Sequence, residues 1–240
     1  MLSHCKVLDG RPHYFVIEAF PETFTTEVIH MTVREGLDQF KNGPYQSFTV
    51  TLNQQQLSNE LISFLGDNGF EKVGTQFFYR RELSSVSPNQ KNFDLKNLHS
   101  IDDDFFKDIW EQARVASKNA PESTSIDHLF EGLKEELGPN YESYCHIAFK
   151  DGLSIGMTIP HPEPGTVDEG RIFYIGILPE HRGKGFGQLL HDDSLALLKA
   201  LGLNVYIGAT GAFNVPMQMI FEKNHCQLFD KRTSFRLMKE

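Results

Sequence analysis

The sequence predicts an α/β (α+β) fold in which a central sheet is flanked by helices, with a smaller α+β domain at the N-terminal side. The first observation is that hydrophobic periodicity in the second half alternates between that of a strand and that of a helix. The second is an apolar, β-rich run, residues 171–178, that leads through a glycine-rich loop into a leucine-rich helical pattern. The third is size, because 240 residues, 40% of them hydrophobic, can bury one large core or two small ones.

The elements of the second half follow in a definite order. Ser100 and Asp103 form a capping box before a helix whose apolar side carries Phe106 and Trp110. A second helix stops at the Gly-Pro pair 138–139, and a Lys-Asp-Gly turn then joins two strands of a hairpin. Strands are expected at 144–149, 153–159, 171–178 and 204–207 and a helix at 188–201, with a further helix and strand after them.

A polar stretch with one proline, residues 84–92, predicts a linker between two domains. We therefore expect an N-terminal α+β domain at residues 1–88 and a second domain at residues 93–240.

Composition narrows the class of protein. A formal net charge of −9 argues against nucleic acid as the main partner. The first 30 residues lack the basic start and apolar run of a signal peptide, and no apolar span is long enough for a membrane helix. Three cysteines, odd in number and far apart, indicate reduced thiols in a cytoplasmic protein and neither a disulfide framework nor a zinc site.

The loop before the leucine-rich helix has the composition of a phosphate-binding loop. Glycines at 183, 185 and 187 let backbone N–H groups approach a ligand, and Arg182 and Lys184 add positive charge at a helix N-terminus. A Walker loop would need Ser or Thr after Gly183-Lys184, and a dinucleotide fingerprint would need glycine where Leu190 stands. The pattern that fits is Arg-x-x-Gly-x-Gly.

Two segments carry a family resemblance. Residues 177–187 resemble the acetyl-CoA signature of the GCN5-related N-acetyltransferases (GNAT superfamily), and residues 214–224 resemble its downstream Asn-to-aromatic-Glu-Lys segment. The resemblance covers residues 93–240, and it implies the GNAT fold with a mixed sheet. The end of the first half, residues 61–81, looks like the closing part of the same fold. It is either a degenerate GNAT-like half or an unrelated α+β domain.

The resemblance implies roles for individual residues. Residues 175–177 match the strand segment whose backbone pairs with the pantetheine arm of acetyl-CoA, and residues 182–187 match the pyrophosphate loop. Asn214 matches the side chain that holds the pantetheine or its phosphate end. For that asparagine, helix capping is the alternative. The residues implied to bind the cofactor are Ile175, Gly176, Ile177, Arg182, Gly183, Lys184, Gly185, Phe186, Gly187 and Asn214.

The usual positions for acid–base chemistry depart from the family pattern, since they hold Arg171, Phe173, Ala209 and Phe221. A lysine-like amine of pKa about 10.4 must lose its proton before it attacks, at a cost of roughly 4–5 kcal/mol near neutral pH. Glu169, two residues before Arg171, is the best candidate for the base. Less favoured candidates are Tyr174, His181 and Tyr206.

We therefore expect transfer of an acetyl or other short acyl group from acetyl-CoA to the primary amine of a small molecule or peptide. The alternative is a noncatalytic acyl-CoA-binding module, and a nicotinamide-dependent oxidoreductase is a third option. A Gly-x-Ser-x-Gly motif at 152–156 lies inside a hairpin strand, which disfavours a serine hydrolase. The sequence indicates neither the identity of the acceptor nor the oligomeric state.

Overall fold

The computed structural model describes residues 1–89, 91–118 and 124–239. The chain forms two compact units. Unit 1 comprises Met1–Phe78 and Phe229–Glu240, and unit 2 comprises Tyr79–Leu228. Two long strands, β4 (Glu71–Glu82) and β10 (Gln227–Met238), contribute residues to both units.

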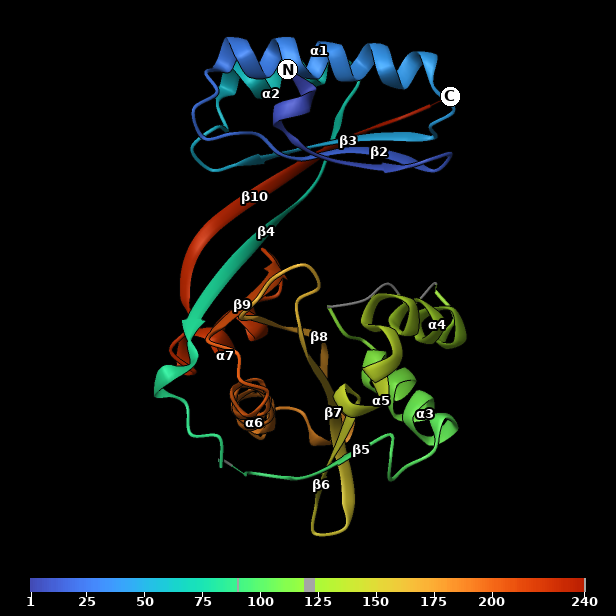
Figure 1. The fold of residues 1–240 in the computed structure, drawn as a ribbon, viewed down its shortest axis with the longest axis vertical. Coiled ribbons are helices and arrows are strands. Elements are labelled where there is room, and N and C mark those ends of the chain that lie inside the picture. The colour runs from blue at the N-terminus through green and yellow to red at the C-terminus, as the bar shows by residue number, and fades with distance from the viewer. Residues whose placement is uncertain (90, 119–123, 240) are drawn as a thin grey trace. The chain divides into compact units, whose positions relative to one another are not determined.

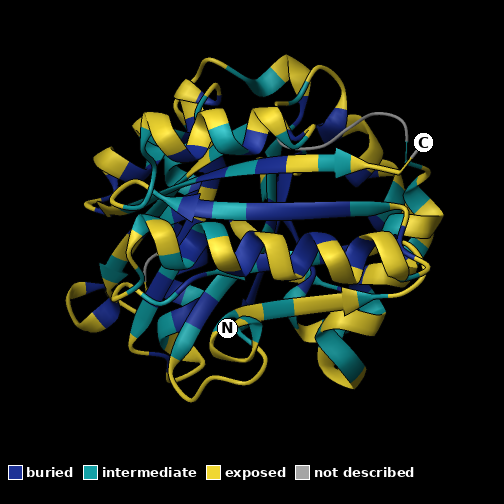
Figure 2. Cartoon of the chain, turned by 90° about the horizontal axis from the view of Figure 1, so that it is seen from above, coloured by how far each residue is buried: buried dark blue, intermediate teal, exposed yellow. Residues whose placement is uncertain are grey.

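Unit 1 is an α+β unit with a mixed sheet. Its strands β1 (Lys6–Gly10), β2 (Tyr14–Ala19) and β3 (Ser47–Asn53) are ordered β1-β2-β3-β10-β4, with β2 and β3 parallel. Helix α1 (Thr26–Asn42) connects these parallel strands, and α2 (Asn59–Asp67) follows β3 (Figure 1). Helix α1 is exposed along one side (Figure 2) and buries Ile29, Val33, Leu37 and Phe40 along the other, the spacing of an amphipathic helix.

Unit 2 contains the second sheet region and its helices. The strands run in the order β4-β9-β8-β7-β6-β5. The strands are β5 (Asp94–Asn97), β6 (His146–Lys150), β7 (Leu153–Pro162), β8 (Glu169–Ile177) and β9 (Val205–Gly211). The helices are α3 (Asp103–Arg114), α4 (Ile126–Leu137), α5 (Tyr141–Tyr144), α6 (Phe186–Ala200) and α7 (Val215–Lys223), and short 3₁₀ turns lie at Leu2–His4, Leu83–Ser85, Gly138–Asn140 and Pro179–His181. Helices α3 and α4 lie on one side of strands β7 and β8, and α6 lies on the other (Figure 1).

The expected order of elements in the second half is confirmed, including the hairpin of β6 and β7. The predicted capping box at Ser100 is wrong. The Asp102 side chain accepts from the Phe105 backbone N–H at 2.8 Å and caps α3, whereas the Ser100 hydroxyl donates to the Asn97 carbonyl. A carboxylate at position 102, two residues closer to the helix than Ser100, is better placed to bond its first N–H groups.

The compact units divide the chain differently from the expected domains 1–88 and 93–240. The last strand returns to unit 1, where β10 pairs antiparallel with β3 over seven residue pairs, from Arg232 with Asn53 to Met238 with Ser47. Pairing between segments so distant in the sequence leaves no local signal, which is why the linker composition alone suggested a different boundary.

Two described points of the stretch expected to be a linker, residues 84–92, are fixed within unit 2, although most of its described residues are exposed. Val86 is buried, and the chain at Asn92 and Phe93 is held by the side chain of Asp193 on α6. The Asp193 carboxylate accepts from the backbone N–H of Asn92 at 2.9 and 3.0 Å and from that of Phe93 at 3.0 Å. Burial raises the pKa of Asp193, and the hydrogen bonds from Asn92 and Phe93 oppose that shift.

Asp193→Ala is expected to lower the free energy of unfolding by roughly 2–3 kcal/mol, because buried N–H groups lose a charged acceptor. Urea denaturation followed by circular dichroism measures the change. Asp192→Ala, at the neighbouring position of α6, is the matched control and should leave the midpoint nearly unchanged. Equal effects of the two substitutions would contradict an anchoring role for Asp193.

Candidate cofactor-binding site

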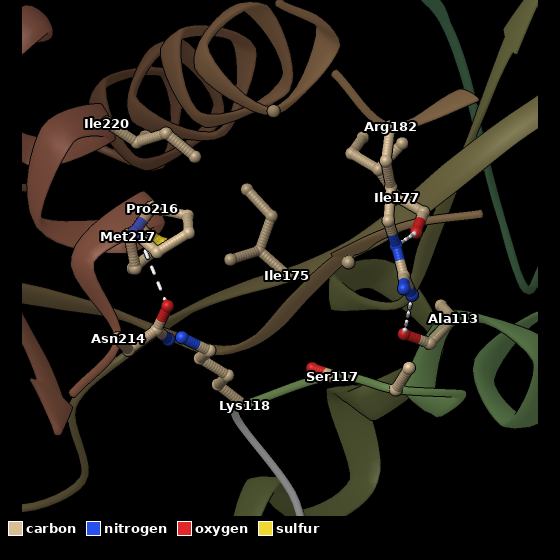
Figure 3. A pocket seen from close by; sticks show the side chains of 13 residues that line it. Ala113, Ser117, Lys118, Ile175, Ile177, Arg182, Asn214, Pro216, Met217 and Ile220 are labelled. Carbon is tan, nitrogen blue, oxygen red and sulfur yellow. Dashed lines mark hydrogen bonds between the residues drawn. The ribbon is translucent and has the colours of Figure 1, made fainter. Parts of the chain in front are cut away.

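A pocket of about 230 Å³ lies in unit 2, where α3 ends and where α6 and α7 begin (Figure 3). One wall is the C-terminal part of β8, and the opposite wall is the first turn of α7. The lining residues are Ala113, Ala116, Ser117, Lys118, Ile175, Gly176, Ile177, Arg182, Gly187, Asn214, Pro216, Met217 and Ile220.

Six of the ten residues expected to bind the cofactor line this pocket, and the other four lie in the adjoining loop and at the first position of α6. The six are Ile175, Gly176, Ile177, Arg182, Gly187 and Asn214, and the four are Gly183, Lys184, Gly185 and Phe186. Of the latter, Lys184 donates its ammonium to the Glu180 carbonyl at 2.9 Å, and Phe186 packs edge-on against Phe93. The structure therefore brings the two sequence motifs, 177–187 and 214–224, to one place.

A β-bulge determines which residues of β8 face the pocket side. Between the pairs Thr158–Ile175 and Pro160–Ile172, β8 has one residue more than β7. Within the bulge, Phe173 and Tyr174 both contact the ring of Trp110 of α3. After it, Ile175 and Ile177 pack with Leu190 of α6.

A glycine in β8 lets α3 approach the strand closely, and two glycines in the loop adopt backbone angles that other residues rarely adopt. A Cβ on Gly176 would lie 2.8 Å from the Tyr174 ring and 3.0 Å from the Ala113 Cβ, so α3 can end directly against β8. Gly183 and Gly185 have φ of +74° and +81°, values that side-chain-bearing residues rarely adopt. Gly185 is the N-cap of the 15-residue helix α6, and no described side chain caps that helix. Its first backbone N–H groups therefore face the loop, as anion binding requires.

The Arg182 side chain has a role that sequence reasoning missed. Its guanidinium donates to the carbonyls of Ile177 at 2.9 Å and Ala113 at 3.0 Å (Figure 3). It also donates to the Val115 carbonyl at 2.8 Å. These bonds fasten the end of α3 to the end of β8. Arg182 thus uses its fork of donors to hold the pocket wall.

Asn214 and Lys118 lie on the other side of the pocket. Asn214 is 6% exposed, and its side-chain oxygen accepts from the Met217 N–H at 3.3 Å. Asn214 therefore caps the N-terminus of α7, which was the alternative role considered for it. The Lys118 ammonium donates to the Phe213 carbonyl at 3.3 Å and links the end of α3 to the start of α7. A ligand in the pocket would lie next to one amide and one ammonium group.

The residues from the end of α3 were not expected at the site. Ala113, Ala116, Ser117 and Lys118 line it, as do Pro216, Met217 and Ile220 of α7. The α7 residues belong to the downstream motif and could have been included from the sequence. The small side chains that end α3 carry no motif, and only the tertiary contact with β8 identifies them.

The catalytic candidate Glu169 lies outside the pocket lining. Its carboxylate is paired with Arg171 Nη2 at 2.5 Å, and Glu163 lies 3.6 Å from Arg171 Nε. Arg171 also approaches the Ile207 carbonyl of β9 at 3.4 Å. Six positions separate Glu169 from Ile175, roughly 20 Å along a strand. The charged cluster thus lies at the opposite end of β8 from the loop.

The other proposed acid–base groups are engaged elsewhere. Burial raises the pKa of Tyr174, whose hydroxyl donates to the Ala113 carbonyl, and raises that of Tyr206 well above its usual value. Phe221, where the family often has tyrosine, is 1% exposed and packs between Tyr79 and His191. None of these side chains is among the pocket-lining residues of the described chain.

One histidine near the usual base position was not identified from the sequence. His161 lies opposite Arg171 in the β7–β8 pair. Its Nδ1 is 2.9 Å from the Pro162 carbonyl, so Nδ1 carries the proton and Nε2 has the lone pair. Burial lowers the pKa of His161, which favours the neutral imidazole.

The described residues contain neither a candidate metal-ion cluster nor a candidate membrane-spanning helix. Across these residues, no group of three His, Cys, Asp or Glu side chains is placed to hold a metal ion. Within the same part of the chain, no helix combines the length and the apolar character that crossing a membrane requires. All three cysteines are free.

Arg182→Ala is expected to lower the free energy of unfolding by about 2 kcal/mol or more, because three backbone carbonyls lose a charged donor. The control is Lys184→Ala, which removes a positive charge two positions away. The Lys184 side chain makes one exposed hydrogen bond, to the Glu180 carbonyl. Differential scanning calorimetry of both variants compares them. A loss no larger than that of the control would contradict the fastening role.

Several solved protein structures resemble this fold. A search of curated proteins finds no match. Among solved structures, a GCN5-related N-acetyltransferase from Sphaerobacter thermophilus is similar, with TM-score 0.70, 12% identity, and coverage of 98% of this chain and 76% of that one. A GNAT-family acetyltransferase from Colwellia psychrerythraea gives TM-score 0.61, 12% identity, and coverage of 94% and 78%. A tandem GNAT protein from the clavulanic acid biosynthesis pathway gives TM-score 0.60, 15% identity, and coverage of 96% and 76%.

These structural likenesses concern the fold, and the sequence itself supplies the family. The model of the acetyltransferase (GNAT) family matches residues 98–225, more than half of the chain. That range contains the strand β8, the glycine-rich loop and the first turn of α7, which together form the pocket. The chain belongs to the GNAT acetyltransferase family.

Proposed function

We propose that the protein transfers an acetyl group from acetyl-CoA to the primary amine of a small molecule or peptide. The observation that carries this proposal is the junction of an uncapped helix N-terminus, a glycine-rich loop and a strand edge at one pocket. The helix N-terminus can bind an anionic diphosphate, and the strand edge can pair with an extended chain that contains amides.

Strand β8 offers a backbone edge for such a chain. It pairs with β9 at Glu169 with Val205 and at Gly170 with Tyr206, although β8 continues to Ile177 and β9 to Gly211. Backbone groups of Ile175, Gly176 and Ile177 therefore border the pocket and can pair with the amides of the pantetheine arm. The loop from Arg182 to Gly187 would hold the pyrophosphate, and Asn214 would contact the pantetheine.

The reaction needs little from the protein beyond positioning. The amine nitrogen forms a bond to the thioester carbon, the C–S bond breaks, CoA leaves as the thiolate, and the amine loses a proton. Holding both reactants in contact can supply roughly 7–11 kcal/mol, against ~10²–10⁴-fold from a general base. An activated thioester with weak acid–base assistance is therefore a consistent mechanism.

Two groups at the N-terminal end of β8 are proposed as the proton acceptor. Glu169 is the first, with Arg171 as its ion-pair partner, and the neutral His161 is the second. The carboxylates of Glu163 and Glu169 exceed the single charge of Arg171, which favours a cationic amine over an anionic acceptor at this end.

The second candidate function is a noncatalytic acyl-CoA-binding module. The observation that favours it is the burial of Phe221 and the pairing of Arg171 at positions where the family often carries acid–base groups. Calorimetry with CoA, followed by detection of free thiol from acetyl-CoA with a panel of amines, separates the two. Affinity with turnover supports the enzyme, affinity without turnover supports the module, and no affinity for CoA rejects both.

Gly187→Asp is expected to weaken CoA binding by at least a hundredfold. The added side chain meets Ile220 at 3.0 Å and brings a negative charge to the phosphate loop. Isothermal titration calorimetry measures the change. Gly132→Asp on α4, where a Cβ meets nothing within 4 Å, is the control and should bind CoA like the unmodified protein. Unchanged binding by Gly187→Asp would place CoA elsewhere.

Glu169→Gln and His161→Asn, assayed in parallel, are expected to identify the proton acceptor. The substitution of the true base should lower turnover about 10²-fold or more with little change in CoA affinity. Glu163→Gln controls for loss of a carboxylate beside Arg171, and His146→Asn controls for loss of a buried histidine with a similar Nδ1–carbonyl contact. If neither Glu169→Gln nor His161→Asn slows turnover beyond its control, general base catalysis by this cluster is rejected.

A further inference from the structure

Unit 1 repeats the order of elements that forms the cofactor pocket in unit 2. In unit 2 the order is β8, α6, β9 and α7, and in unit 1 it is β2, α1, β3 and α2. In each case the two strands are parallel and the first helix connects them. We infer that unit 1 contains the equivalent cleft in a charge-reversed form whose backbone groups are bonded by its own side chains, so that the whole chain binds one acyl-CoA. This inference rests on the proposed function of unit 2.

A second pocket lies at the equivalent place. It is formed where α1 and α2 begin and β3 ends, as the first is formed where α6 and α7 begin. The N-cap of α2 is Ser58, in the position that Asn214 has before α7. The lining residues are Glu22, Phe24, Thr25, Thr26, Glu27, Ile29, Asn53, Gln55, Gln56 and Ser58.

The loop before α1 lacks the chemistry of a phosphate loop. Residues 20–25 contain no glycine and no basic side chain, whereas the loop before α6 contains Gly183 and Gly185 together with Arg182 and Lys184. The side chain of Thr25 accepts from the Val28 N–H at 3.4 Å and so caps α1, while no described side chain caps α6. The backbone donors that a diphosphate would need are therefore partly occupied in unit 1.

The charge at the start of α1 is opposite to that at the start of α6. Glu22 and Glu27 border the unit 1 pocket, and a hydrogen bond from Thr25 lowers the pKa of Glu27, which keeps it ionised near neutral pH. A diphosphate placed there would face two carboxylates instead of two cations. The dipole of α1, worth about 0.3–1 kcal/mol at an exposed site, would have to offset that repulsion.

The strand ends are also tied together by a side chain. The Gln56 amide donates to the carbonyls of Phe20 at 3.3 Å and Pro21 at 3.2 Å, just beyond the end of β2. The Gln56 backbone N–H donates to Asn53 Oδ1 at 2.9 Å, at the end of β3. Gln56 thus makes, with its own amide, the bonds that a pantetheine amide would make in an open cleft. The β2–β3 pairing extends over four residue pairs, against two for β8 and β9.

Size does not explain the difference between the two pockets. The unit 1 pocket, at about 320 Å³, is larger than the unit 2 pocket at about 230 Å³. Charge and internal hydrogen bonding are therefore the properties that exclude a nucleotide thioester from unit 1.

The test is the stoichiometry of CoA binding to the full chain, measured by isothermal titration calorimetry and by native mass spectrometry. We expect one CoA per chain, at least a hundredfold weaker binding in Gly187→Asp, and affinity within twofold of the unmodified protein in Thr25→Asp. The two variants place the same side chain at the start of equivalent helices, and Asp is a good N-cap, so Thr25→Asp should fold.

Each outcome is decisive. Two CoA molecules per chain, or one that survives Gly187→Asp and is lost in Thr25→Asp, would overturn the inference. One site that is lost only in Gly187→Asp supports it. No binding of CoA by the folded, unmodified chain would instead overturn the proposed function of unit 2.

Discussion

The early separation of β8 from β9 is the constraint on which the site depends. Two parallel strands that stay paired would satisfy each other's backbone groups and leave no edge for a ligand. Here the recorded pairing covers two residue pairs, and β8 continues to Ile177 with its backbone facing a pocket. The bulge before Ile175 then turns the following side chains toward α6. The strand that carries the site is thus anchored at its start and open at its end.

The open end needs support from outside the sheet, and charged side chains provide it. The three bonds of Arg182 bind the end of α3 to β8, and Lys118 reaches from the same helix end to the chain before α7. At the other end of β8, Arg171 is held by Glu169 and Glu163 and approaches β9. Positive side chains therefore hold backbone in place at both ends of the separated strands, and the aliphatic residues between them remain available to a ligand.

Site residues that lie within one short segment could be predicted from the sequence. Site residues that depend on contacts between distant segments could not. Glycine spacing and the strand-to-helix change predicted a phosphate-binding loop at residues 182–187, because those signals lie within one short segment, and the family resemblance added residues 175–177. The place of Asn214 came from a second motif. The role of Arg182, the end of α3 and His161 depends on contacts across the sheet, which leave no pattern in neighbouring residues. The position of β10 beside β3 was missed for the same reason, whereas the helix and strand order followed from hydrophobic periodicity.

The pairing of β10 with β3 has a consequence for synthesis of the protein. Ser47 pairs with Met238, a separation of 191 residues (238 − 47). N-terminal domains commonly fold while the ribosome is still translating the rest of a chain. The sheet of unit 1 cannot gain this strand until translation has passed β10, so β3 keeps an unpaired edge throughout the making of unit 2. Such an edge invites pairing with other chains. That exposure ends only when β10 has been synthesised and can pair with β3.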